Sequence, residues 1–167
     1  AEKQEGVPIK KEFKIVACGF NWGEGGELLP EQDPESWAEE LLPIVRGSDI
    51  QVDGKLRSGL IKINYDMLKK RGMFSRTCDF DLHSSTRPRL LLADITSKIK
   101  VTYTTKPILP MNSVKVIFHK ENNVDRLQDL LDYLGEETTF KRLKKGRPNL
   151  HLTKGNLETL LIPEGDA

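Results

Sequence analysis

Two carboxylates and an imidazole alternate with less polar residues in one short stretch, residues 78–83, which reads CDFDLH. In a β-strand, Asp79, Asp81 and His83 would lie on one face, because successive side chains point to opposite sides. Oxygen and imidazole ligands at that spacing suit Mg²⁺, Mn²⁺ or Zn²⁺, which promote phosphoryl transfer when other elements complete the site. The solvated face of an antiparallel strand explains the same alternation without a ligand, and we favour that interpretation.

A third acid that could complete such a site is Asp94, at the end of the apolar run 90–93. A strand Asp-x-Asp with a third acid on another strand resembles the arrangement in palm-like primases and nucleotidyltransferases. The resemblance covers a three-residue motif, and it implies a metal-dependent phosphoryl-transfer enzyme that uses Asp79 and Asp81. We keep this enzyme as an alternative function.

Basic residues form two clusters along the chain that could contact the phosphates of a nucleic acid. Residues 69–106 hold nine bases against three acids, and residues 141–147 add a second cluster. If both clusters lie on one side of the fold, they will neutralise several phosphates and bind with steep salt dependence. A solvated charged face that only improves solubility would have the same composition. The expected nucleic-acid contacts are Lys69, Lys70, Arg71, Arg87, Arg89, Lys141, Arg142, Lys144, Lys145 and Arg147.

The net charge of +1 hides a separation of charge between two parts of the sequence. Residues 12–53 hold ten acids against two bases, whereas residues 54–167 hold 21 bases against 13 acids. Such a bipolar distribution can steer a polyanion toward one side of a protein or orient a protein partner. It is equally compatible with two oppositely charged faces that neutralise each other within one domain.

A glycine-rich segment, residues 19–26, follows a predicted strand and invites comparison with phosphate-binding loops. It lacks the lysine and the serine or threonine that a P-loop requires, and Glu24, Glu27 and Glu31 would repel phosphate. Its acids and Trp22 fit better with docking to a basic protein surface. We therefore keep a protein-interaction module within an assembly, which would use this loop with Trp22 and the C-terminal helices, as the first alternative function. A plain flexible loop explains the same segment without a partner.

The cysteines and the remaining histidines do not indicate a cofactor. Cys18 and Cys78 lie in predicted buried strands, and one possible bridge is too few for a disulfide scaffold, so we expect reduced thiols. His119 and His151 have no cysteine or histidine neighbours at zinc-binding spacing. We expect no cofactor and, on balance, no enzymatic activity.

Apolar periodicity and turn residues predict the secondary structure. Residues 33–46 favour a helix that begins at Asp33-Pro34 and ends at Gly47, and residues 49–63 favour a hairpin around Asp53-Gly54. The expected strands are 13–20, 77–83, 89–95, 98–105 and 113–119. Further helices are expected at 66–71, 124–134 and over about eight residues from Thr153.

Because these strands follow one another instead of alternating with helices, we predict an α+β fold. The expected sheet is antiparallel or mixed, has about six strands, and is covered by one helix from the N-terminal half and two C-terminal helices. Residues 12–162 would form the single domain, between flexible tails at 1–11 and 163–167. We predict a non-catalytic, nucleic-acid-binding domain of a larger intracellular protein, cytoplasmic or nuclear, with no contact to membranes, because no apolar run approaches membrane-spanning length.

Overall fold

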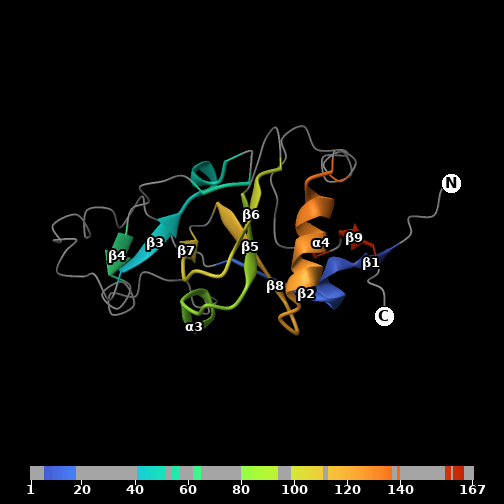
Figure 1. Cartoon of the computed structure of the whole chain (residues 1–167), viewed down its shortest axis with the longest axis horizontal. Coiled ribbons are helices and arrows are strands. Elements are labelled where there is room, and N and C mark those ends of the chain that lie inside the picture. Colours follow the sequence, from blue (N-terminus) through green and yellow to red (C-terminus); the bar gives the residue numbers. More distant parts are fainter. Residues whose placement is uncertain are drawn as a thin grey trace.

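The computed structural model shows a strand-rich fold in which one long helix packs on a central sheet (Figure 1). It describes residues 6–17, 41–51, 54–56, 62–64, 80–93, 99–110, 113–136, 139, 157–158 and 160–163. The strands are β1 (Val7–Pro8), β2 (Phe13–Val16), β3 (Leu41–Val45), β4 (Lys62–Asn64), β5 (Arg89–Ala93), β6 (Val101–Thr104), β7 (Leu109–Pro110), β8 (Val114–His119) and β9 (Leu161–Ile162). The helices are α3 (Phe80–His83) and α4 (Val124–Leu134), and two 3-10 turns are η1 (Ile9–Lys11) and η4 (Gly47–Asp49).

The central sheet has four strands in the order β2-β8-β5-β6, and each neighbouring pair is antiparallel. Its two middle strands are rich in leucine and β-branched residues, which suit a pleated, buried surface. In the register between β5 and β8, Leu90 lies opposite Ile117 and Leu91 opposite Val116. The predictions of strands within 89–95, 98–105 and 113–119 are confirmed by β5, β6 and β8.

Both faces of the central sheet are covered, so every residue of β5 and β8 is buried. On one face, α4 contributes Leu127, Leu130 and Leu134 to a core that also contains Leu90 and Leu92. On the other face, a second core forms around alternate residues of the same strands. Its members are Val45, Ile50, Leu91, Ala93, Ile108, Val114, Val116 and Phe118.

Two smaller sheets lie on opposite sides of this centre (Figure 1). One has the order β4-β3-β7, in which β3 pairs antiparallel with β4 and parallel with β7. The other joins β1 to β9 and thereby brings the two ends of the described chain together beside α4. Ile9 and Ile162 of these end segments are buried in the same core as the α4 leucines.

Helix α4 has the bounds that the sequence predicts. The side chain of Asn123 accepts a hydrogen bond from the Arg126 amide at 3.1 Å, which caps the helix start, and Gly135 follows its last residue. The buried residues recur at the three- and four-residue spacing of one helical face. The structure confirms the predicted helix. Its capping residue, its apolar face and the glycine that follows it all lie within or next to residues 124–134, so the local sequence was sufficient to predict it.

The predicted fold class is wrong in its helices. Within the described residues, α4 is the only helix of seven or more residues, whereas we expected one long helix before residue 47 and two in the C-terminal third. Residues 41–45 of the first predicted helix form strand β3 instead. Pro43 would disrupt the interior of a helix. In β3, Pro43 pairs with β4 alone among the described strands, because β7 pairs with Ile44 and Val45. A strand tolerates proline where one side of its backbone has no partner strand.

The last predicted helix is also wrong. Only Leu157 and Glu158 are helical in the described part of this segment, and Leu161–Ile162 form β9. Leu157 and Leu160 are buried, as expected, in the core that contains the α4 leucines. The next two residues, Leu161 and Ile162, pair with β1 and are therefore extended. That pairing also gives structure to Val7–Lys11, which we expected to lie in a flexible tail.

The strand predicted over residues 77–83 is wrong where the structure describes it, because Phe80–His83 form α3. Four residues of alternating polarity fit a single helical turn as well as a strand.

The predicted hairpin around Asp53-Gly54 is shorter in the structure than we expected. Ile50 bridges Leu56, and Gly54 has a positive φ of 81°, while β4 pairs with β3 instead of extending the hairpin.

The predicted helix at 66–71 lies outside the described residues. No helix in the described part of the chain is long and apolar enough to cross a lipid bilayer.

Candidate nucleic-acid interface

Of the ten basic residues that we predicted to contact nucleic acid, the structure describes Arg87 and Arg89. Both belong to the segment that leads from α3 into β5, on the side of the central sheet opposite α4. The other eight lie outside the described residues, as does Trp22. The geometry of the candidate interface therefore rests on these two arginines and on the residues around them.

Arg89 is wholly buried, so its side chain organises the protein instead of meeting a ligand from solvent. Its guanidinium donates from Nη1 to the His83 carbonyl at 2.7 Å and from Nε to the Arg87 carbonyl at 3.0 Å. Nη2 donates to the carbonyl and to the hydroxyl of Ser85. Since a guanidinium is a rigid fork of donors, these contacts fix the path of the backbone from residue 83 to residue 87.

The positive charge of Arg89 has no described carboxylate within ion-pair distance. Burial, followed by the nearby charge of Arg87, lowers the pKa of Arg89 to about 10. The group therefore stays protonated near neutral pH, and the Phe118 ring, whose centroid lies 5.0 Å from the guanidinium carbon, contributes a cation–π contact. A buried cation held by carbonyl groups and an aromatic ring raises the positive potential of the surface above it.

Arg87 is only partly buried, and it lies next to this buried cation. Its guanidinium carbon is 5.1 Å from the centroid of the same Phe118 ring. Nε donates to the side-chain oxygen of Asn122, and Nη2 donates to the His119 carbonyl at 2.6 Å. Nη1 carries two further N–H groups, and it donates to none of the described residues.

The four described arginines differ in whether a carboxylate neutralises them. Arg46 pairs with Asp49 at 3.5 Å, and Arg126 pairs with Glu12 at 2.7 Å and with Asp129 at 3.3 Å. Neither Arg87 nor Arg89 forms an ion pair with any described carboxylate. Among the described arginines, the two at the start of β5 are therefore those without an acidic partner in the described part of the chain.

Lys14 extends this positive region onto the neighbouring edge strand. It is exposed and lies directly opposite Phe118 in the β2–β8 register, on the side of the sheet that Arg87 also occupies. The opposite side of the sheet differs in charge, because residues 121–136, which include α4, hold five acids and one base.

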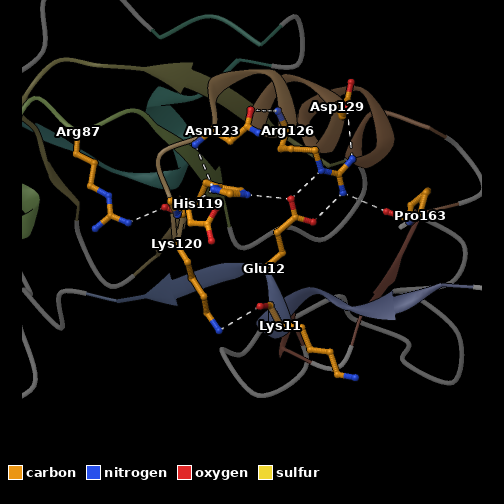
Figure 2. A network of polar contacts seen from close by, with 10 residues as sticks. Lys11, Glu12, Arg87, His119, Lys120, Asn123, Arg126, Asp129 and Pro163 are labelled. Carbon is orange, nitrogen blue, oxygen red and sulfur yellow. Dashed lines mark hydrogen bonds and ion pairs between the residues drawn. The ribbon is translucent and has the colours of Figure 1, made fainter. Parts of the chain in front are cut away.

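A second polar cluster ties the N-terminal segment to α4 and to β8, as Figure 2 shows. Glu12 receives two hydrogen bonds from Arg126, at 2.7 and 2.8 Å, and it contacts Nε2 of His119 at 2.9 Å. The hydrogen bonds from Arg126 and His119 outweigh burial and lower the pKa of Glu12, and the same contact raises the pKa of Arg126. Arg126 also donates to the Pro163 carbonyl at 3.2 Å, so the C-terminal segment joins the cluster.

The hydrogen bonds around His119 define which ring nitrogen carries the proton. Nδ1 lies 3.0 Å from the Glu121 amide and 3.1 Å from the Asn123 amide. Both amides are donors, so Nδ1 must accept, and the neutral ring carries its proton on Nε2, which donates to Glu12. The ring is buried and packs edge-on against Phe13 at 5.1 Å.

The turn after β8 connects this second cluster to Arg87 (Figure 2). The carbonyl of His119 accepts from the Asn122 amide at 3.1 Å as well as from Arg87. Asn122 has a positive φ of 59°, which asparagine tolerates better than most residues, and its side chain accepts from Arg87. One turn therefore holds the guanidinium of Arg87 by two acceptors and is itself shaped by the imidazole of His119.

Glu12, Lys14, His119 and Arg126 were not among the predicted site residues. The sequence contained one indication for Lys14. It lies between the apolar residues Phe13 and Ile15 of a predicted strand, so its side chain should point to the opposite face of the sheet from theirs. Glu12 and Arg126 are 114 positions apart, and no local pattern indicates that they meet.

Most of the predicted metal site lies outside the described residues, so that site stays a prediction. Asp79 and Asp94 lie outside the described residues, and the side chain of Asp81 is not described. His83 belongs to α3, not to the strand that we expected. Its ring is wholly buried against Phe118, and neither ring nitrogen has a hydrogen-bond partner among the described residues.

Comparison with known proteins does not assign this surface. No protein-family model matches the chain, and no curated protein is similar to it in sequence.

Proposed function

We propose that the chain is a non-catalytic binding domain that contacts nucleic acid through the surface around Arg87, on the side of the central sheet opposite α4. Arg87 is the phosphate-contacting residue in the described part of this face, and Lys14 adds positive charge at its edge. Arg89 acts as a positioning residue that holds the segment carrying Arg87. The remaining proposed contacts are Lys69, Lys70, Arg71, Lys141, Arg142, Lys144, Lys145 and Arg147.

The observation that carries this proposal is the fixed guanidinium of Arg87, which has no acidic partner among the described residues. Its guanidinium is fixed by Asn122, His119 and the Phe118 ring, yet it pairs with no described carboxylate. A fixed guanidinium with free N–H groups is suited to a phosphate oxygen, because little conformational entropy is lost on binding. Arg46 and Arg126, by contrast, are already engaged by acids.

Nucleic-acid binding also suggests where the protein works. The domain acts inside the cell, in the cytoplasm or the nucleus, as one part of a larger protein. Phe80–His83 form α3 and not the strand that the metal-dependent phosphoryl-transfer alternative assumed, so we do not develop that alternative further.

Fluorescence anisotropy with a labelled single-stranded RNA and its DNA counterpart, at about 50 mM salt, tests the proposal. Loss of one charge-assisted contact weakens binding about tenfold or more, which is the result that we expect for Arg87→Gln. Arg46→Gln removes the same formal charge from an arginine that already has an acidic partner, so its affinity should stay within about twofold of the parent. Equal losses in the two variants, or no binding by the parent, would refute the proposal.

A further inference from the structure

His119 is placed so that its protonation state determines the shape of the turn that holds Arg87. Its Nδ1 is the acceptor for the amides of Glu121 and Asn123, and its carbonyl is an acceptor for Arg87 itself. Asn122, between those two amides, supplies the second acceptor for Arg87. We propose that protonation of His119 releases Arg87 and weakens nucleic-acid binding, an inference that rests on the proposed function.

The chemical step is the addition of one proton to Nδ1. In the neutral ring, the lone pair on Nδ1 accepts two backbone N–H groups. In the imidazolium, Nδ1 becomes a donor that faces two donors, so both hydrogen bonds are lost and the turn must rearrange. Nε2 keeps its proton in both states, so the contact from Nε2 to Glu12 persists and the change is confined to the turn.

The charged groups around His119 come from each element that packs against it. Glu12 precedes β2, Arg126 lies on α4, Arg87 precedes β5, and Lys120 and Glu121 belong to the turn itself. An added proton increases the positive charge of this region, and general electrostatics would then strengthen polyanion binding on acidification. The proposed rearrangement predicts the opposite sign, so the direction of the pH dependence distinguishes the two effects.

Two substitutions separate the functions of the two ring nitrogens. His119→Asn places a side-chain oxygen near the position of Nδ1, where it accepts both amides at every pH and does not titrate. His119→Gln reaches Glu12 in place of Nε2 but leaves no acceptor for the turn. We expect affinities without pH dependence for both variants, and His119→Asn should bind more tightly than His119→Gln because it keeps the acceptor for the turn.

Anisotropy titrations with the labelled RNA at about pH 7.5 and about pH 5 test this inference. The parent should lose roughly fivefold to tenfold in affinity on acidification, which corresponds to weakening of one arginine–phosphate contact. His151→Asn, which removes a different imidazole, should keep the parental pH dependence. An affinity that rises or stays constant on acidification, or a His119→Asn variant that still responds to pH, would overturn the inference.

A measurement without nucleic acid separates failure of this inference from failure of the proposed function. Long-range proton–nitrogen NMR should show the Nε2–H tautomer of His119 at neutral pH. On acidification, the Arg87 Nε–H and the amides of Glu121 and Asn123 should shift together with the His119 ring. Unlinked shifts, or global unfolding by circular dichroism at about pH 5, would overturn the inference whether or not the parent binds RNA.

Discussion

Replacing Glu12 by glutamine should destabilise the fold substantially, because Glu12 joins the N-terminal segment to β8 and α4, which lie 107 and 114 positions further along the chain. Its carboxylate receives two hydrogen bonds from Arg126 and one from His119. The side chains of Glu12 and Arg126 are 25% and 18% exposed, so water screens the pair only in part. The neutral amide that Glu12→Gln introduces can accept through its oxygen but cannot neutralise the guanidinium.

The expected loss follows from the contacts that glutamine cannot replace. A hydrogen bond to a charged group contributes about 1.5–3 kcal/mol, and part of that is retained through the amide oxygen. We therefore expect Glu12→Gln to lower the free energy of unfolding by about 2 kcal/mol at neutral pH. For a chain of this length, that corresponds to a melting temperature lower by roughly 4–8 °C.

The pH dependence of this loss has a defined sign. The pKa of Glu12 in the folded protein is lowered from its ordinary value of 4.5, so the carboxylate stabilises the fold fully above that value. The contribution disappears as the pH falls below 4.5 and through the lowered pKa of the folded state. The difference in stability between parent and variant should therefore be constant near neutral pH and shrink in acid.

Urea unfolding of the parent, Glu12→Gln and Glu121→Gln, followed by circular dichroism from neutral to acidic pH, measures this difference. Glu121 is exposed and forms no described ion pair, so Glu121→Gln serves as the matched control and should change stability by less than about 0.5 kcal/mol. A Glu12→Gln variant as stable as the control would refute our interpretation of the cluster. A loss that persists unchanged at low pH would show that it does not arise from the carboxylate charge.

Three further predictions concern α4, the buried arginine and the second basic cluster. Asn123→Ala removes the cap of α4 and should cost about 1 kcal/mol in unfolding free energy, measured by urea denaturation. Arg89→Met leaves three backbone carbonyls without their donor and should cost about 3 kcal/mol by the same assay, whereas an equally stable variant would contradict the positioning role. Reversing Lys144 and Lys145 to glutamate should weaken oligonucleotide binding at low salt, and unchanged anisotropy titrations would remove that cluster from the interface.

The elements that the sequence predicts correctly are those with a complete local description. Helix α4 has a capping residue, a regular apolar face and a following glycine within its own segment. Strands β5 and β8 are short segments rich in leucine and β-branched residues, which fit a buried sheet. In each case tertiary packing reinforces the local preference.

The elements that the sequence mispredicts depend on distant partners. The apolar spacing from Leu41 to Val45 fits one face of a helix. These residues form a strand instead, because they pair with β4 and β7, and Pro43 is compatible with this strand. The spacing of the leucines near the C-terminus fits a helix, but Leu161 and Ile162 form a strand because they pair with Pro8 and Val7 of β1. Sequence periodicity contains no information about these pairings.

The candidate interface was predictable in composition but not in geometry. Arg87 and Arg89 are two residues apart and chemically identical, yet one is partly exposed and the other wholly buried. Their difference arises from the carbonyl groups of the preceding segment and from Phe118 on β8, which no local pattern reveals. The sequence could therefore suggest a basic surface without distinguishing the residue that contacts a ligand from the one that positions it.

The salt dependence of RNA binding, compared between the parent and Arg87→Gln, tests the central proposal most directly. Each neutralised phosphate of a single strand contributes about −0.7 to the slope of log affinity against log salt concentration. If Arg87 contacts one phosphate, the magnitude of the slope should fall by about 0.7 in Arg87→Gln and remain unchanged in Arg46→Gln. Identical slopes for the parent and Arg87→Gln would contradict the assignment of Arg87 to the interface.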